Sequence, residues 1–205
     1  VQCRHQLLHA ENGDVDVGQG GHHVGVALVG HNDQRAGLGD ADVGAGDTHV
    51  AGHELLAQLG DLVAELADEP IETYQSVRTE TVNFDANWKI YTDNFVEGYH
   101  IPGIHPKFFA AIDFEQFKTT AHKGFIRMTA PPREGLFYRG KWLWMWPNWT
   151  LSLFEGGMNT SRINPIAFDR TEQLYHFYFA DVSPETAASR QDTIARNLAV
   201  VREDY

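Results

Sequence analysis

The sequence predicts an α+β fold, in which the strands of an antiparallel sheet are flanked by helices. Several segments after residue 73 alternate between side-chain types and are rich in β-branched and aromatic residues, which is typical of half-buried strands. Apolar residues recur at helical spacing around residues 87–98 and again after residue 183. A run of strands bounded by two helices favours a sheet that packs against those helices.

The expected strands cover residues 74–84, 114–117, 124–129, 141–149, 150–155, 161–168 and 174–182. Alternation within residues 141–149 places Trp142, Trp144 and Trp146 on one side of a strand. Two interpretations stay open for these rings. They fill the core, or they line a pocket that holds a cationic methylammonium group.

Three helices are expected. The first covers residues 87–98, a short one covers residues 107–112, and the last begins at Ser183. The start of the last helix combines an N-cap serine, a proline at the first position and an acid in the first turn. Its apolar face consists of Ala187, Ile194, Leu198, Val201 and Tyr205.

Residues 1–70 differ in composition from the rest of the chain. They contain no Phe, Trp, Tyr, Lys or Ile, and they hold twelve of the 19 glycines and seven of the 11 histidines. Such a segment cannot bury enough apolar surface to offset its ordering entropy, so we expect a low-complexity segment that is disordered or non-native. Three origins stay open: a loose metal-binding segment, a natural disordered arm, and an out-of-frame translation of GC-rich DNA. Only residues 53–66 indicate a helix, through their leucines.

The charge of −12 is concentrated in this first segment, which has twelve acidic and two basic residues. The remaining 135 residues have 16 acidic and 14 basic residues, so their charge gives no reason to expect nucleic acid or membrane binding. Cys3 is the single cysteine, which excludes an internal disulfide. No apolar run is long enough to cross a bilayer and no signal-peptide pattern is present, so a cytoplasmic location is expected.

Two histidines lie close together in residues 87–106, with the sequence NWKIYTDNFVEGYHIPGIHP. On a continuous helix, residues five apart point roughly 140° away from each other, so His100 and His105 could not share a metal there. We expect Gly98, Pro102 and Gly103 to end the helical pattern, and Pro102 and Gly103 to fold His105 back toward His100. Glu97 lies one turn before His100, so its carboxylate can approach the same centre.

The string N-W-K-x3-D-N-x2-E-x-Y-H-x4-H resembles the iron-binding segment of Rieske non-haem iron oxygenase α-subunits, the ring-hydroxylating oxygenase family. The resemblance implies that His100 and His105 bind a mononuclear iron. The third ligand in the family is an aspartate in an acidic pair on a helix, which implies Asp204, with Glu203 as the alternative. The resemblance also implies that Glu97 links the iron to the electron donor of a neighbouring subunit. Glu97 and Asp93 are expected to orient the histidines.

The resemblance implies a curved antiparallel sheet that grips a long helix, the helix-grip fold of START and Bet v1 proteins. Residues 71–205 would then be a truncated catalytic domain with mononuclear Fe(II). A Rieske 2Fe-2S cluster needs C-x-H followed by C-x2-H, so this chain cannot ligate one with Cys3 alone. The cluster is expected in the intact protein, and the chain is expected to be inactive by itself.

The implied activity is O2-dependent hydroxylation of an aromatic or quaternary-ammonium substrate, by a mono- or dioxygenase. Electrons would pass from NAD(P)H through a reductase or ferredoxin to the Rieske cluster of a homotrimer. Glu97, where many members have aspartate, and the W-P-N segment at residues 146–148 favour the choline and carnitine branch. Two alternatives stay open: a non-enzymatic helix-grip domain that binds apolar ligands, and a zinc hydrolase.

Overall fold

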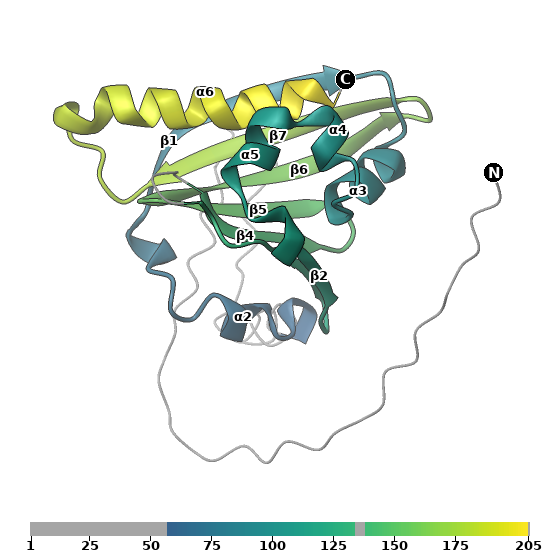
Figure 1. Ribbon diagram of the computed structural model, residues 1–205, viewed down its shortest axis with the longest axis horizontal. Coiled ribbons are helices and arrows are strands. Elements are labelled where there is room, and N and C mark those ends of the chain that lie inside the picture. The colour runs from purple at the N-terminus through teal and green to yellow at the C-terminus, as the bar shows by residue number, and fades with distance from the viewer. Residues whose placement is uncertain (1–56, 134–137, 205) are drawn as a thin grey trace, which may run out of the picture. The chain divides into compact units, whose positions relative to one another are not determined.

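The computed structural model describes residues 57–133 and 138–204, and these residues form a seven-stranded antiparallel sheet with helices packed on it. The strand order is β1-β7-β6-β5-β4-β3-β2 (Figure 1). The strands are β1 (Gln75–Phe84), β2 (Lys118–Ala121), β3 (Phe125–Thr129), β4 (Tyr138–Met145), β5 (Trp149–Phe154), β6 (Gly157–Ala167) and β7 (Arg170–Phe179). The predicted α+β class is confirmed.

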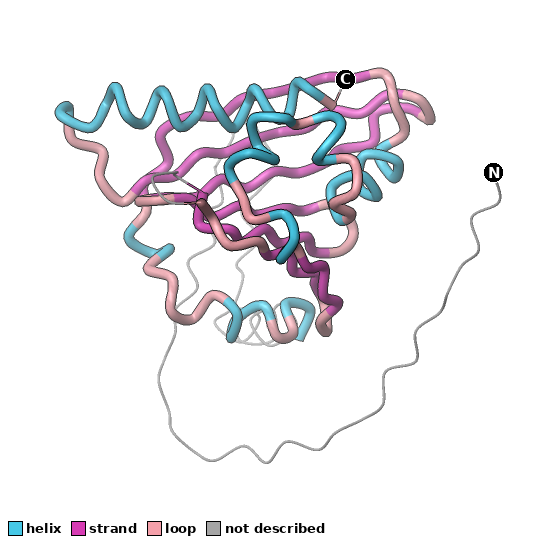
Figure 2. The backbone as a smooth tube through the Cα atoms, in the orientation of Figure 1, coloured by secondary structure: helices cyan, strands magenta, loops and turns pink. Residues whose placement is uncertain are grey.

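The helices separate into one long C-terminal helix and several short ones (Figure 2). The α-helices are α2 (Leu62–Glu65), α3 (Trp88–Val96), α4 (Ile101–Ile104), α5 (Pro106–Ala111) and α6 (Ala187–Glu203). The 3-10 helices are η1 (Ile71–Thr73), η2 (Phe114–Gln116) and η3 (Pro184–Thr186). Asn87 caps α3 by accepting a hydrogen bond from the backbone N–H of Lys89 at 3.0 Å. None of the helices in the described part of the chain is long and apolar enough to span a membrane.

The strand expected at residues 114–117 was a wrong prediction, because these residues begin with the 3-10 helix η2 and the strand β2 follows them. Residues three apart lie above one another in a 3-10 helix. Phe114 and Phe117 therefore face the same side, and their rings stack with centroids 5.7 Å apart. On a strand, residues three apart would point to opposite faces, so the shared side of these two rings reflects the helical turn.

Trp146 does not share a strand face with Trp142 and Trp144, as the sequence had suggested. β4 ends at Met145, so Trp146 lies in the turn before β5 and its surface is 69% exposed. Its ring is 6.1 Å from that of Trp144 and 6.5 Å from that of Trp88. Trp142 is buried in the core.

Helix α6 packs on one face of the sheet, which we call the inner face (Figure 1). Ile194 and Leu198 of α6 contact a cluster that includes the buried rings of β7, and these rings alternate along the strand as its pleat requires. The rings are Tyr175, Phe177 and Phe179. This packing holds the C-terminal end of α6 against the inner face, where the candidate site lies.

The outer face of the sheet is covered by residues 57–66. Leu59 and Leu62 pack with side chains of β3 to β6 that point away from α6, namely Phe125, Leu143, Leu151, Leu153 and Met158. Residues 57–59 and 62–65 are helical, and the start of the helix expected over residues 53–66 lies outside the described residues. The division of the chain at residue 70, with a low-complexity segment before it, stays a prediction. Leu59 and Leu62, near the end of that segment, pack on the sheet.

Glu65 joins this outer layer to the sheet through two ion pairs. Its carboxylate oxygens lie 2.8 Å from Arg127 Nη1 and 2.9 Å from Lys141 Nζ. Burial raises the pKa of Glu65, but hydrogen bonds and charge interactions with Lys141 and Arg127 outweigh it, so the net shift is downward. A carboxyl group whose pKa is lowered by folding stabilises the protein above its unfolded pKa, and this stabilisation is lost as the pH falls.

We therefore expect Glu65→Gln to lower the free energy of unfolding by about 1–2 kcal/mol at neutral pH. The difference from the wild type should shrink as the pH falls through about 4, the ordinary range of a glutamate. Urea denaturation at several pH values measures both effects. Glu72→Gln, at an exposed position of η1, is the matched control. An equal loss at pH 7 and at low pH would show that the ion pairs are not the cause.

Candidate metal centre

His100 and His105 are brought together by the short helix α4. His100 precedes the helix and His105 follows it, and the backbone N–H of His105 donates to the carbonyl of Ile101 at 2.9 Å. The two rings lie with centroids 5.0 Å apart and planes at 81°. His100 and His105 therefore lie close together, as the sequence predicted.

The helix ends before His100, close to the expected end at Gly98, whereas the prediction of a break at Pro102 and Gly103 was wrong. α3 ends at Val96, and a Cβ atom at Gly98 would lie only 2.4 Å from Cε1 of Phe117. Gly98 therefore lets the chain pass close to this ring. Pro102 and Gly103 belong to the single turn of α4, and Pro102 lies in its first turn, where a missing N–H costs little.

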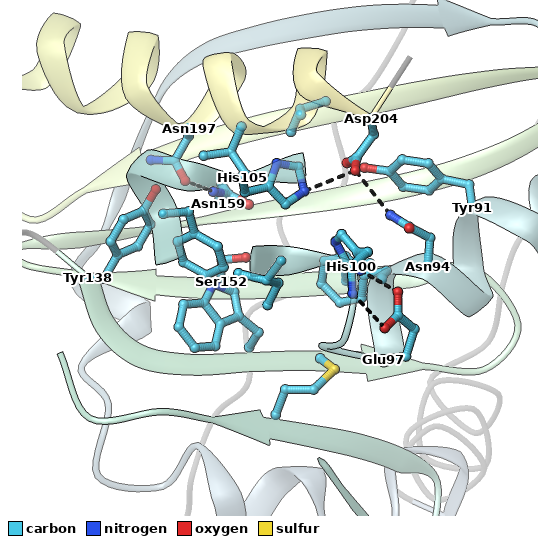
Figure 3. A pocket seen from close by; sticks show the side chains of 18 of the residues that line it. Tyr91, Asn94, Glu97, His100, His105, Tyr138, Ser152, Asn159, Asn197 and Asp204 are labelled. Atoms are coloured by element: carbon cyan, nitrogen blue, oxygen red, sulfur yellow. Dashed lines mark hydrogen bonds and ion pairs between the residues drawn. The ribbon is translucent and has the colours of Figure 1, made fainter. Parts of the chain in front are cut away.

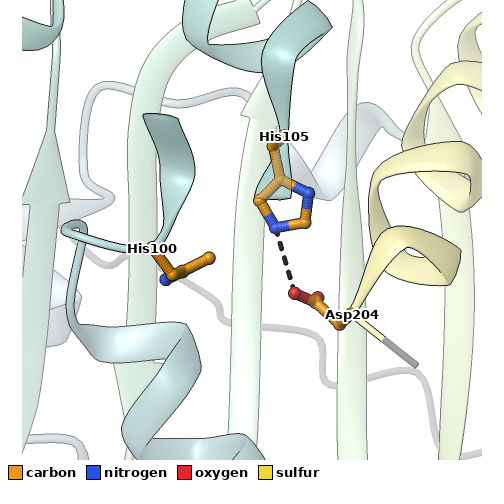
Figure 4. Close-up of side chains that lie close together, drawn as sticks. All are labelled: His100, His105 and Asp204. Carbon is orange, nitrogen blue, oxygen red and sulfur yellow. Dashed lines mark ion pairs between the residues drawn. The ribbon is translucent and has the colours of Figure 1, made fainter. Parts of the chain in front are cut away.

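Asp204 reaches the histidines from the C-terminal end of α6 (Figure 4). Its Oδ1 atom lies 3.0 Å from Nε2 of His105. One ligand atom from each of His100, His105 and Asp204 lies within 4.8 Å of the others. The three residues predicted as metal ligands thus form one compact group, although Asp204 is about a hundred residues away in sequence.

Two further carboxylates hold the other ring nitrogens of the histidines. Nδ1 of His100 contacts Oε1 of Glu97, and Nδ1 of His105 lies 2.9 Å from Oε2 of Glu203. Glu97 also accepts the backbone N–H groups of Tyr99 at 2.6 Å and His100 at 3.3 Å, which fixes its carboxylate. With a proton on each Nδ1, both Nε2 atoms are free to bind a metal.

Asp93 does not take the orienting role expected for it. Its side chain is exposed on α3, and within the described residues it makes no hydrogen bond to either histidine. Glu203 is the carboxylate at His105 instead. Glu203 was also the alternative third ligand, but it contacts Nδ1, whereas Asp204 contacts Nε2.

Asn94 is a site residue that the sequence did not reveal. Its Nδ2 atom donates to Oδ1 of Asp204 at 3.1 Å (Figure 3). The bond joins α3 to the end of α6 and fixes one oxygen of the proposed ligand. The available signal was its position three residues before Glu97, on the same side of the helix.

The acids change the protonation of the buried groups around them. Burial lowers the pKa of His105, but hydrogen bonds to Asp204 and Glu203 outweigh it, so the pKa of His105 is raised. Burial also raises the pKa of Tyr91, and the nearby Tyr175 and Asp204 raise it further. A metal bound to Nε2 of His105 would take the place of the proton there.

The donor set fits a divalent transition-metal ion. Two imidazoles and one carboxylate on one side of an ion form the facial triad of non-haem Fe(II) oxygenases, which leaves positions open for other ligands. The carboxylates at Nδ1 of each histidine are the outer partners that such ligands usually have. His100 and His105 would bind through Nε2, and Asp204 through its carboxylate.

A cavity of about 110 Å³ lies beside these residues, between α3 to α5, the inner face of the sheet and α6 (Figure 3). One side of it is aromatic. The ring of Phe108 lies edge-on to those of Tyr138 and Trp142, with centroids 5.0 and 5.3 Å apart. Trp142 thus belongs to the core and also lines the cavity.

The fold and the site together define an α+β domain with a candidate two-histidine, one-carboxylate centre next to a cavity. Residues 71–135 match the family described as the ring hydroxylating alpha subunit, catalytic domain. This match confirms the resemblance to Rieske non-haem iron oxygenase α-subunits over this segment.

The chain is also similar to individual proteins, which are choline and carnitine monooxygenases. The chain is 22% identical over 161 residues to a chloroplastic choline monooxygenase of Amaranthus tricolor, covering 75% of this chain and 36% of that protein. It is 28% identical over 137 residues to the carnitine monooxygenase oxygenase subunit of Escherichia coli K12, covering 62% of this chain and 36% of that protein. The chain thus spans about a third of the length of these relatives.

The structure is similar to that of the quaternary ammonium Rieske monooxygenase CntA in complex with an inhibitor. The TM-score is 0.64 at 23% identity, and the match covers 73% of this chain and 43% of that chain. At this identity the likeness concerns the fold.

Proposed function

We propose that this chain binds Fe(II) and supports O2-dependent hydroxylation of a small organic substrate. The observation that carries the proposal is the group of His100, His105 and Asp204, whose ligand atoms lie within 4.8 Å of one another. The family match over residues 71–135 favours iron over the zinc of a hydrolase. The adjacent cavity gives a substrate a place next to the proposed metal.

The proposed reaction replaces a C–H bond of the substrate by C–OH. In monooxygenation, one atom of O2 enters the product and the other leaves as water, which consumes two electrons and two protons. Bound iron would supply the reductive activation of O2. The chain's residues hold the histidines in one tautomer through Glu97 and Glu203, and line a cavity for the substrate.

The electrons are proposed to come from NAD(P)H through a reductase or ferredoxin and the Rieske 2Fe-2S cluster of the intact protein. A homotrimer would place the cluster of one subunit next to the iron of its neighbour, with Glu97 as the bridge. Glu97 is suited to this role because one of its oxygens contacts Nδ1 of the ligand His100.

The proposed substrate is a quaternary ammonium compound, with an aromatic compound as the alternative. The named relatives are choline and carnitine monooxygenases. The aromatic wall of the cavity, formed by Phe108, Tyr138 and Trp142, also suits a methylated cation, since aromatic faces attract cations.

Hydrogen peroxide offers a test that needs no electron donor, because it is equivalent to O2 together with the two electrons and two protons of the reaction; one of its oxygen atoms enters the product and the other leaves as water. The full chain is loaded anaerobically with Fe(II), and isotope-labelled peroxide is added with choline. We expect about one iron per chain and a product that gains one labelled oxygen atom. Iron-loaded protein that gives no product would count against hydroxylation. Binding of apolar ligands without any metal uptake would favour the ligand-binding alternative.

Glu97→Gln tests the proposed bridge in the intact enzyme. Glutamine keeps the shape of the side chain but loses the charge that faces His100. We expect iron to remain bound, with an affinity loss of about tenfold or less. Electron transfer from the cluster should become slow, which single-turnover kinetics can follow. Asp93→Asn, at an exposed position of α3, is the control. Normal turnover in Glu97→Gln would refute the bridging role.

A further inference from the structure

We propose that the cavity selects a methylated ammonium ion that carries a neutral hydroxyl group over one that carries a carboxylate. This inference rests on the function proposed above and names the substrate class of the same site. It follows from the charge of the cavity lining, from its aromatic wall and from a pair of neutral polar side chains on the inner face of the sheet.

The lining of the cavity is acidic. Among the described residues that line it, Glu97 and Asp204 carry carboxylates and none is a lysine or arginine. A ligand carboxylate would lie near like charges, and the two histidines of the lining already pair with Glu97, Glu203 and Asp204, so its binding is unfavourable. A bound divalent metal would not reverse this balance, because Glu97, Asp204 and Glu203 together carry three negative charges around it.

The aromatic wall completes a site for a cation. Phe108, Tyr138 and Trp142 line the same cavity, and their rings contact one another edge-on or tilted. A methylated ammonium group gains from both the ring faces and the acidic surroundings. The volume of about 110 Å³ is small beside the roughly 300–1,000 Å³ of typical ligand pockets, so the ligand is small.

Ser152 and Asn159 form the neutral polar pair. They are directly opposite each other on β5 and β6, so their side chains lie on one face of the sheet at a Cβ separation of roughly 5 Å. Both line the cavity (Figure 3). Asn159 is 3% exposed, and its Nδ2 atom donates to Oδ1 of Asn197 at 3.0 Å.

The carbonyl oxygen of Asn159 therefore remains as an acceptor, and the hydroxyl of Ser152 remains as a donor or acceptor. Within the described residues neither atom has a hydrogen-bond partner. A ligand hydroxyl can donate to Asn159 Oδ1 and accept from Ser152 Oγ at the same time. A carboxylate has no proton to donate, so its oxygen would face the carbonyl oxygen of Asn159.

Calorimetric titration of the full chain with three ligands tests the inference. The ligands are choline, ethyltrimethylammonium, which lacks the hydroxyl, and γ-butyrobetaine, which carries a carboxylate. We expect choline to bind about three- to tenfold tighter than ethyltrimethylammonium, as one or two net hydrogen bonds require. It should bind at least about tenfold tighter than γ-butyrobetaine. Titrations without metal and with Fe(II) under anaerobic conditions should give the same order.

Ser152→Ala tests whether Ser152 binds the hydroxyl group of the ligand. The variant should weaken choline binding about three- to tenfold and leave ethyltrimethylammonium binding unchanged, whereas a general disturbance of the cavity would weaken both. Asn164→Ala is the matched control, since Asn164 lies on β6, contacts Glu172 and does not line the cavity. Asn164→Ala should bind all three ligands like the wild type.

Equal or tighter binding of γ-butyrobetaine would overturn the inference, and so would an unchanged choline preference in Ser152→Ala. Iron uptake, measured separately, keeps the two proposals apart. A chain that binds iron but prefers γ-butyrobetaine would overturn the ligand preference alone. A chain that prefers choline but takes up no iron would overturn the oxygenase proposal alone.

Discussion

Replacing His100 with alanine is expected to lower Fe(II) affinity by at least about 100-fold. Changes to outer partners of metal ligands typically cost 10- to 100-fold, and this variant removes a proposed ligand itself. His105→Ala should have an effect at least as large. His105 is 2% exposed and lies between Asp204 and Glu203, so its loss would also leave two partly buried carboxylates without their partner.

Anaerobic titration with Fe(II), followed by metal analysis of the desalted protein, measures the loss. His122→Ala is the matched control, because His122 lies between β2 and β3, stacks on Phe125 and does not line the cavity. The control should retain about one iron per chain. Wild-type iron content in both His100→Ala and His105→Ala would mean that the iron is bound elsewhere.

Asp204→Asn and Glu203→Gln are expected to differ sharply, since the two acids contact different nitrogens of His105. Asp204 lies at Nε2, on the side of the other proposed ligands, so Asp204→Asn should reduce Fe(II) affinity by about 100-fold or more. Glu203 lies at Nδ1, so Glu203→Gln should cost about 10- to 100-fold.

The same iron titration compares these variants. Asp192→Asn provides the control, since Asp192 is exposed on α6 and pairs with Arg196 one turn away. A larger loss in Glu203→Gln than in Asp204→Asn would reverse the two roles and make Glu203 the ligand. Equal iron binding in all three variants would show that neither Asp204 nor Glu203 is a ligand of the iron.

Much of the fold could be predicted because its signals are local. The alternation in β7 and the helical spacing in α6 are imposed by the pleat and the helical turn, and both are visible in a short window of sequence. Family resemblance then linked His100 and His105 with Asp204 across about a hundred residues. The structure brings these three side chains together.

The other features depend on contacts between distant segments. Asn94 meets Asp204 only when α3 packs beside the end of α6, and Ser152 faces Asn159 only in the observed register of β5 and β6. Neither pairing has a local pattern. The end of α3 near Gly98 was expected from the sequence, but the close approach of Phe117 to Gly98 was not, because it joins two separate segments.

Anomalous diffraction at the iron edge, from crystals of the Fe(II)-loaded chain grown without oxygen, tests the proposed centre most directly. The expected result is a single strong peak within bonding distance of Nε2 of His100, Nε2 of His105 and the carboxylate of Asp204. A peak at other residues would contradict the proposed centre, and so would an empty site with the two imidazoles turned apart.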